Sequence, residues 1–204
     1  MKRALLAASA LALSLPTAAF AETWEIDSSH TTSAFEVTHM LVSTVRGQFD
    51  KTTGTLDIDD KDLTKSTLDI TIDASSVNTR NADRDKHLRT AEFFDVEKHP
   101  QITFKSTKVE KGKKKDQLKV AGDLTIRGIT KPVVLDVTYT GKQVASPWGK
   151  TVRGASAIGK INRKDWDIIW NTKLDAGGLA VSNEVTLIID AEFNQPTPGA
   201  AKTN

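Results

Sequence analysis

Four histidines are the residues of this chain best suited to metal binding or proton transfer, because the sequence has no cysteine. They are His30, His39, His87 and His99, and they lie in different segments. No pair has the i, i+4 spacing that places two zinc ligands on one helical face. His39, His87 and a carboxylate could still meet in three dimensions as a metal site, and His39, Asp85 and His87 could form the polar centre of an enzyme.

The usual sequence signatures of catalysis and cofactor binding are missing. The chain has no Gly-x-Ser-x-Gly elbow, no phosphate-binding loop and no dinucleotide fingerprint. Asp85 and His87 are two residues apart, so on a helix they would face different sides. We therefore expect no enzymatic activity, no cofactor and no metal. Under this interpretation the polar residues satisfy buried backbone groups and cap a helix.

The elements that would position these residues are mainly β-strands, because apolar and polar residues alternate along most of the chain. One apolar face and one polar, solvated face favour antiparallel pairing, in a sandwich or an up-and-down barrel, and periodicity alone does not choose between them. A closed barrel of about eight strands has room for side chains or for one ligand. The alternating segments are residues 33–37, 45–49, 56–58, 68–72, 102–104, 118–126, 133–139, 151–161 and 185–193.

One segment, residues 78–99, lacks this alternation and predicts a short helix near residues 81–90. Asn81 is a suitable N-cap, and acidic residues follow it where the helix dipole favours them. Leu88, Phe93 and Phe94 could plug or line one end of a barrel. Pro100 then favours an extended chain at the residue before it.

The first 21 residues have the pattern of a cleavable signal peptide. Lys2 and Arg3 precede an apolar run of about a dozen residues, and small residues lead to a cleavage site after Ala21. That run is shorter than the roughly 20 residues of a spanning helix, and no cysteine follows for lipid attachment, so we expect no stable membrane anchor. Residues 195–204 are rich in Pro and Ala and predict a disordered tail.

The charge of the expected mature chain argues against nucleic acid as a partner. Without Lys2 and Arg3, the 28 basic residues become 26, equal to the 26 acidic ones. Binding to nucleic acid needs clustered cations that neutralise phosphates. The four lysines within residues 111–115 are interpreted as the solvated tip of a hairpin. Residues 22–194 are long enough for one substantial core and show no sign of a second domain.

Five blocks of residues follow one another between about residues 24 and 193. They are Trp24-x-Ile26-Asp27-x-x-His30 with Phe35-x-Val37-x-His39 and Val45-x-Gly47-x-Phe49; Arg84-Asp85-x-His87-Leu88 with Phe93-Phe94-Asp95 and His99-Pro100-x-Ile102-x-Phe104-x-Ser106; Gly122-Asp123-Leu124-Thr125-Ile126-x-Gly128-Ile129-Thr130-Lys131; Asn162-Arg163-x-Asp165-Trp166; and Val181-Ser182-x-Glu184-Val185. Together they resemble the YceI-like family of polyisoprenoid-binding proteins. In one departure, Trp166 and Asp167 stand where many relatives carry Phe and Gly.

The resemblance implies an all-β fold, a single antiparallel lipocalin-like β-barrel of about eight strands across residues 22–194, with a long apolar tunnel. It also implies secretion to the periplasm. The function expected is a binding or carrier protein that sequesters a long-chain isoprenoid lipid, of the polyprenyl or isoprenoid quinone type. A homodimer is compatible with this interpretation. The residues expected to line the tunnel are Phe35, Val37, Phe49, Leu88, Phe93, Phe94, Ile102, Phe104, Trp166, Ile168 and Trp170.

A polar head group would need hydrogen-bond donors at the mouth of the tunnel. His39, Arg84 and Arg163 are the candidates, since Arg can hold a phosphate with two parallel bonds. Arg163 has an alternative role, as the surface partner of Asp165 or another carboxylate.

Two other functions stay open at this point. A fully packed barrel would suit a stress-related module that binds another protein through its outer surface. An enzyme acting on isoprenoid compounds would use His39, Asp85 and His87. Apolar inward residues are needed by any barrel that folds, so they do not by themselves predict a cavity.

Overall fold

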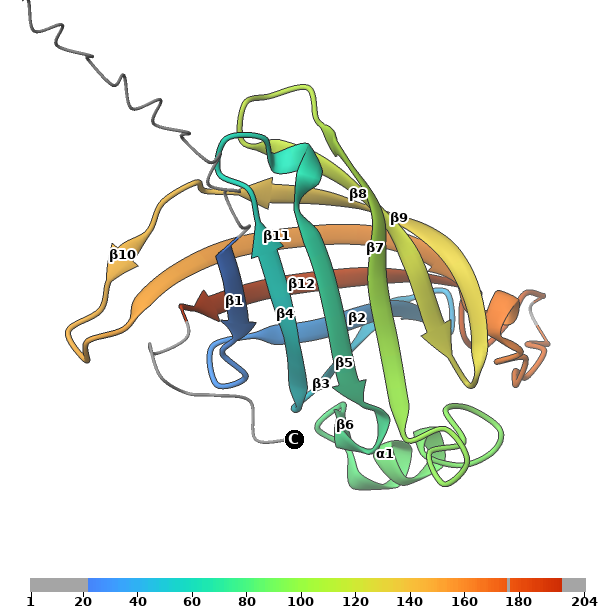
Figure 1. Cartoon of the computed structure of the whole chain (residues 1–204). Coiled ribbons are helices and arrows are strands. Elements are labelled where there is room, and N and C mark those ends of the chain that lie inside the picture. The colour runs from blue at the N-terminus through green and yellow to red at the C-terminus, as the bar shows by residue number, and fades with distance from the viewer. Residues whose placement is uncertain (1–21, 176, 196–204) are drawn as a thin grey trace, which may run out of the picture.

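The structure, a computed structural model, describes residues 22–175 and 177–195 (Figure 1). The expected signal peptide, residues 1–21, and residues 196–204 of the expected tail lie outside the described residues. Gln195, the first residue of that expected tail, donates its backbone N–H to the Thr151 carbonyl at 2.9 Å. Within the described ranges, no helix has the length and apolarity needed to cross a membrane.

The described chain is built mainly of strands, with one short α-helix and three single turns of 3₁₀ helix. The helix is α1 (Ala82–Leu88), and the turns are η1 (Leu63–Lys65), η2 (Ala74–Ser76) and η3 (Arg163–Trp166). The strands are β1 (Glu22–Ile26), β2 (Thr32–His39), β3 (Ser43–Phe49), β4 (Thr52–Ile58), β5 (Thr67–Asp73), β6 (Val77–Asn78), β7 (Gln101–Lys111), β8 (Gln117–Ile126), β9 (Ile129–Tyr139), β10 (Val144–Ala145), β11 (Thr151–Asn162) and β12 (Glu184–Asn194).

Eight of these strands close into an antiparallel barrel, which confirms the predicted fold and selects the barrel over the sandwich. The order is β11-β9-β8-β7-β5-β4-β1-β12, and β12 pairs back to β11 along its whole length. The other edge of β12 is shared. It pairs with β2 over Thr186–Asp190 and with β1 at Phe193 and Asn194. Strands β2, β3 and β6 therefore extend the barrel wall beyond the ring, and β10 pairs with the start of β11.

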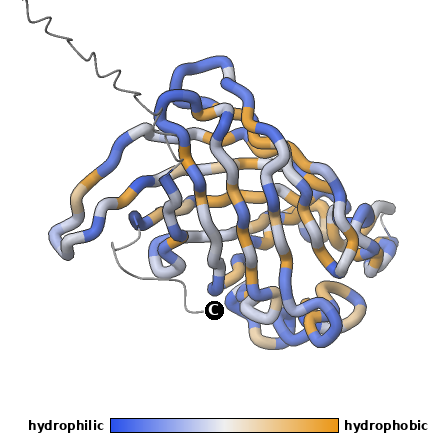
Figure 2. The backbone as a smooth tube through the Cα atoms, viewed as in Figure 1, coloured by the Kyte–Doolittle hydropathy of each residue, from blue (hydrophilic) through white to orange (hydrophobic). Residues whose placement is uncertain are grey.

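The alternation along β12 shows why these residues form strands around a common interior. Val185, Leu187, Ile189, Ala191 and Phe193 share the inward face, because side chains on a strand alternate between its two sides. Figure 2 shows hydrophobic and hydrophilic positions alternating along the neighbouring strands. The predicted strand at residues 151–161, whose small residues blur its pattern, is β11.

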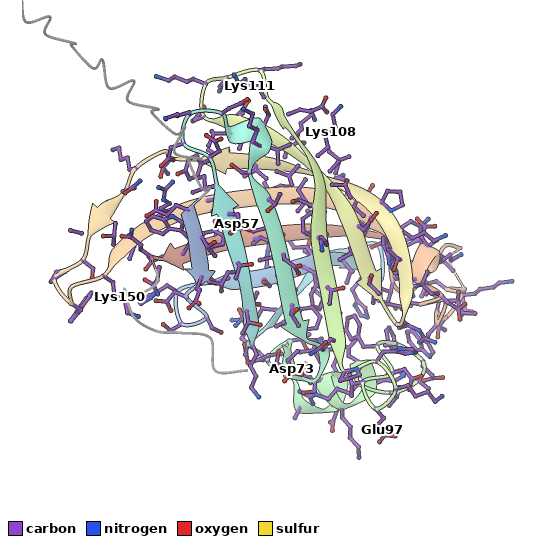
Figure 3. The ribbon with its side chains drawn as sticks, viewed as in Figure 1. Asp57, Asp73, Glu97, Lys108, Lys111 and Lys150 are labelled. Carbon is purple, nitrogen blue, oxygen red and sulfur yellow. The ribbon has the colours of Figure 1, made fainter. Side chains whose placement is uncertain are left out.

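The hairpin between β7 and β8 confirms the interpretation of the lysine-rich segment. β7 ends at Lys111 and β8 begins at Gln117, and Lys111 and the three lysines between the two strands are exposed. Lys108 and Lys111 point away from the barrel at this end, while Glu97 lies at the opposite end (Figure 3).

Helix α1 lies at the end of the barrel opposite that hairpin (Figure 1). Its N-cap is Asn81, as predicted, and the side-chain oxygen of Asn81 accepts the Arg84 N–H at 3.0 Å. A series of turns follows the helix, and β7 restarts an extended chain directly after Pro100. The helix and these turns bring Leu88, Phe93 and Phe94 against the barrel interior.

Candidate functional site

An internal cavity of about 570 Å³ occupies the barrel. Its volume falls within the range of about 300–1,000 Å³ that is typical of small-molecule sites. Inward side chains of β2, β3, β5, β7, β8, β9, β11 and β12 form its walls, together with α1 and the segment after η3. The interior is therefore not solidly packed, in contrast to what the packed-module alternative requires.

The cavity is elongated along the barrel. Five alternate residues of β12, from Val185 to Phe193, line it. Eight residue steps at 3.3–3.4 Å correspond to about 27 Å of strand. Ile26, which pairs with Phe193, also lines the cavity, whereas Val181 lines it before β12 begins. A space of this shape suits a chain-like molecule better than a compact one.

The cavity opens between α1 and the hairpin of β2 and β3. Three of its lining residues, His39, Asp83 and Arg84, are exposed, and all three lie at this end of the barrel. The other residues that line the cavity are buried or half-buried. A ligand would therefore meet polar side chains at the opening and hydrocarbon beyond it.

Aromatic rings line the part of the cavity next to this opening. Phe49 contacts Phe35 and Phe94, with ring centroids 5.8 and 5.4 Å apart. Phe93 and Trp170 lie 5.3 Å apart. These separations and tilted or edge-on geometries are those of favourable aromatic pairs. The rings therefore give a well-defined apolar surface near the entrance.

All eleven apolar residues expected to line a tunnel line this cavity. Their contact with a ligand stays a prediction. Trp166 is almost fully buried, and its indole N–H donates to the Leu124 carbonyl at 3.2 Å, which fixes the ring in the wall. The expected residues are Phe35, Val37, Phe49, Leu88, Phe93, Phe94, Ile102, Phe104, Trp166, Ile168 and Trp170.

Sequence reasoning missed many other lining residues, although their strands were predicted. The signal that could have found them is the same alternation, since each lies on the inward face of its strand. They include Val120, Leu124, Val133, Leu135, Leu187 and Ile189.

The three expected polar residues all line the cavity, in different environments. His39 is exposed at the end of β2 and forms an isolated β-bridge with Val181. Arg84 is exposed near the start of α1, and its Nε and Nη2 donate to the hydroxyl and carbonyl oxygens of Thr79 at 2.8 and 2.9 Å. Both are exposed at the opening, and their binding of a head group stays a prediction.

Arg163 is buried instead of lying on the surface, with 5% of its area exposed. Its Nη1 donates to the carbonyls of Ile168 and Trp170, both at 2.8 Å, and its Nε donates to Ser182 at 3.0 Å. Within the described ranges, no carboxylate lies within ion-pair distance of it. Burial lowers the pKa of this guanidinium. Arg163 therefore ties the backbone of Ile168, Trp170 and Ser182 together beside the cavity.

The residues considered for an enzymatic centre have separate hydrogen-bond partners. Asp85 is buried and accepts hydrogen bonds from the backbone N–H and hydroxyl of Thr79, at 2.8 and 2.5 Å. The His87 Nε2 pairs with Glu92 at 2.5 Å. No hydrogen bond among the described residues joins His39, Asp85 and His87. The contacts of Asp85 fix the turn before α1, which is a structural role.

One cluster of potential metal ligands lies elsewhere, at the connection between β1 and β2. Asp27, His30 and Glu192 bring ligand atoms within 4.8 Å of one another, but none of them lines the cavity. Hydrogen bonds from Ser29 and then Asn194 lower the pKa of Asp27. These contacts already explain the arrangement as a connection between the β1–β2 turn and β12.

The chain is similar to known proteins along most of its length. The model of the YceI-like domain matches residues 24–193. Protein YceI of Escherichia coli O157:H7 is 41% identical over 176 residues, covering 85% of this chain and 87% of that protein.

Solved structures with this fold include the Campylobacter jejuni YCEI protein. It has a TM-score of 0.66 and 32% identity, and the match covers 78% of this chain and 90% of that one. A domain from Saccharophagus degradans, described as polyisoprenoid binding and implicated in plant cell wall breakdown, has a TM-score of 0.59 and 14% identity. That match covers 87% of this chain and 99% of the domain, and shows a shared fold.

Proposed function

The chain belongs to the YceI-like domain family, and we propose that it is a binding protein that holds a long-chain isoprenoid lipid inside its barrel. The ligand would be of the polyprenyl or isoprenoid quinone type. The observation that carries the proposal is the elongated apolar cavity of about 570 Å³, open at one end.

The physical chemistry of an isoprenoid fits such a cavity. Each prenyl unit has five carbons, and burial gains about 0.8 kcal/mol per CH₂-sized group, hence about 3–4 kcal/mol per unit. Summed over several units, this would exceed the tightest known affinities, so ordering of the chain and imperfect packing must offset much of it. A long chain therefore needs an enclosed apolar channel and few polar contacts.

The description of the Saccharophagus degradans domain as polyisoprenoid binding supports the ligand class. The proposal includes export to the periplasm, supported by the charged and apolar pattern of residues 1–21. In that compartment the protein would sequester or carry its lipid and would perform no chemistry on it. The separate hydrogen-bond partners of Asp85 and His87 support this part of the proposal.

Organic extraction of protein purified from its native source, followed by mass spectrometry, tests the proposal. We expect one apolar isoprenoid in a stoichiometric amount, released only when the protein is denatured or extracted. An empty extract from native protein would contradict the proposal and favour a protein-interaction module.

A further inference from the structure

We propose that the tip of the hairpin between β2 and β3, Met40–Val42, docks onto the surface of a lipid bilayer beside the cavity opening. The inference rests on the proposed function, since it concerns how the lipid enters and leaves.

The hairpin tip is apolar and strongly exposed. Met40, Leu41 and Val42 expose 43%, 64% and 85% of their area. Single exposed apolar residues are common, but three consecutive ones at the tip of a turn form a continuous apolar surface. Leu41 lies against Gly178, where a Cβ would come within 3.1 Å of its Cδ1, yet 64% of the Leu41 area stays exposed.

The backbone of the turn is also unusual for these residue types. The Val42 N–H donates to the His39 carbonyl at 3.1 Å, which closes a four-residue turn. Met40 and Leu41, its two central residues, have φ values of +52° and +63°. Turns with positive φ at both central positions strongly favour Asn-Gly, because side chains with a Cβ are strained there. The turn therefore presents bulky apolar groups in a conformation that better suits small polar ones.

The tip is continuous with the opening of the cavity. His39, which directly precedes it, lines the cavity and bridges Val181, which also lines it. The Met40 N–H donates to the Ala180 carbonyl, and the Ala180 N–H donates to the Thr172 carbonyl, both at 2.8 Å. Figure 1 shows the segment after β11 beside the β2–β3 turn at one end of the barrel.

A fourth exposed apolar residue, Ile169, lies on the same rim. Ile169 exposes 63% of its area, although its neighbours Ile168 and Trp170 both line the cavity. Asn171 ties this segment to Val181 through a hydrogen bond of 2.6 Å. The apolar surface of the rim therefore leads into the cavity wall.

A bilayer is the occupant that the chemistry of this rim fits. An isoprenoid resides in a bilayer, and its transfer through water would expose the whole apolar chain. If the tip enters the headgroup region, the chain can pass from hydrocarbon to cavity along an apolar path. Short apolar insertions of this kind bind membranes weakly and reversibly, which suits a protein that exchanges its cargo.

The other end of the barrel supplies a control surface. Trp148, in the turn between β10 and β11, exposes 85% of its area, and tryptophan favours membrane interfaces. It lies beyond the start of β11, whereas the cavity rim follows the end of β11. Docking through Trp148 would turn the opening away from the bilayer.

Single-cysteine labelling distinguishes the two orientations, because the chain has no native cysteine. Val42→Cys and Trp148→Cys would each carry an environment-sensitive fluorophore, and vesicles of phosphatidylethanolamine and phosphatidylglycerol would be added. We expect the Val42→Cys label to shift to the blue and brighten, and the Trp148→Cys label to stay unchanged. A response at Trp148→Cys alone, or at neither site, would overturn the proposal.

A paired substitution separates docking from structure. Met40→Asn with Leu41→Gly gives the turn its preferred residues, so the protein should be at least as stable as the wild type. If the apolar tip serves docking, partitioning onto the same vesicles should fall at least about tenfold, as expected on losing two inserted side chains. Unchanged partitioning would contradict the inference.

Extraction of lipid from this paired variant distinguishes the inference from the proposed function. We expect its lipid content after purification to match that of the wild type, since the cavity is unaltered, while uptake of isoprenoid from vesicles becomes slower. Vesicle binding by a protein that never contains lipid would contradict the proposed function alone. Stoichiometric lipid without vesicle binding would contradict docking alone.

Discussion

The guanidinium of Arg153 lies over the ring of Trp24, with its Cζ 4.1 Å from the ring centroid. The Arg153 side chain is completely buried, and it donates to both carboxylate oxygens of Asp60 at 2.8 Å and to the Tyr139 hydroxyl at 2.7 Å. Trp24 and Tyr139 belong to the second apolar cluster of the barrel, separate from the larger one. The Arg153 guanidinium thus connects its own strand β11 to β1, β9 and the β4–β5 connection, at the end of the barrel opposite α1.

Replacement of Arg153 should therefore destabilise the barrel. Arg153→Met removes a desolvated cation–π contact and charged hydrogen bonds, so we expect a loss of about 2–4 kcal/mol in the free energy of unfolding. Asp60 is half-exposed, so water can hydrate its carboxylate after Arg153 is removed. The loss of stability should therefore stay below the largest values measured when one partner of a fully buried ion pair is removed. Urea denaturation measures the change.

The control is Lys160→Met on the same strand. Lys160 pairs with Glu184 at 2.8 Å, but both side chains are more than 60% exposed. An exposed pair of this kind contributes at most about 1 kcal/mol. If Arg153→Met and Lys160→Met lowered the free energy of unfolding equally, the contacts of Arg153 would stabilise the fold no more than an exposed ion pair does.

The pH dependence of stability should change when Asp60 is replaced. The hydrogen bond from Arg153 is the main cause that lowers the pKa of Asp60 in the folded protein. A carboxyl whose folded pKa is depressed stabilises the fold above its unfolded pKa, about 3.9, and this contribution is lost as the pH falls through the folded pKa.

We therefore expect the melting temperature of Asp60→Asn to fall less than that of the wild type when the pH is lowered from about 5 to about 2. Thermal melts at a series of pH values measure the difference. Asp190→Asn, which removes an exposed carboxylate, controls for the change in net charge. Parallel profiles for the wild type and Asp60→Asn would refute the linkage between Asp60 and acid stability.

Close approach of a ring to the backbone makes Gly122 sensitive to substitution. A Cβ at this position would lie 2.6 Å from the Lys105 carbonyl oxygen and would also meet the ring of Phe104, which lines the cavity. We expect Gly122→Ala to cost about 1–3 kcal/mol, the usual range for overpacking.

Gly154→Ala provides the comparison, measured in the same denaturation experiment. A Cβ at residue 154 would meet only the Ala191 carbonyl, at an ordinary distance of 3.7 Å. Its stability should equal or slightly exceed that of the wild type, because Ala loses less backbone entropy on folding. Tolerance of Ala at both positions would argue against a fixed Phe104 ring.

The cavity itself can be filled from β11. Ala157 is buried and lines the cavity, whereas Ile158, the next residue, points outward and is 56% exposed. Ala157→Phe should reduce bound lipid at least about tenfold, a loss of about 1.4 kcal/mol, by occupying the ligand's space. Because the new ring enters a void, the free energy of unfolding should change by less than about 1.5 kcal/mol.

Ile158→Phe adds the same ring to the outer surface and should leave the lipid content unchanged. Both variants are compared by extraction and mass spectrometry of equal amounts of folded protein. Full lipid content in Ala157→Phe would exclude this part of the cavity as the ligand site.

The strands and the inward residues were accessible from the sequence because both depend on a period of two. The eight-stranded ring, the short helix and its Asn81 cap are confirmed by the structure. The same pattern explains why the expected residues of β2, β3 and β7 line the cavity, whereas those of α1, of the turns after it and of the segment from η3 onward lie outside the strands. The alternation of apolar and polar residues does not predict whether the barrel contains a cavity, since a packed barrel would show the same alternation.

Contacts between distant segments could not be predicted from periodicity. Arg153 occupies an inward position on β11 where the pattern calls for an apolar residue, and its partners come from distant segments. Arg163 resembles a surface residue in a charged sequence segment, but it is buried against three backbone carbonyls. Only the fold brings these acceptors together.

Strand β12 completes the ring on both of its edges, against β11 on one side and against β2 and β1 in turn on the other. It is also the last strand in chain order within residues 22–175 and 177–195. As the chain leaves the ribosome or a translocation pore, the earlier strands can form only an open sheet with unpaired edges. The apolar cavity therefore cannot be enclosed until β12 has emerged and paired with β11.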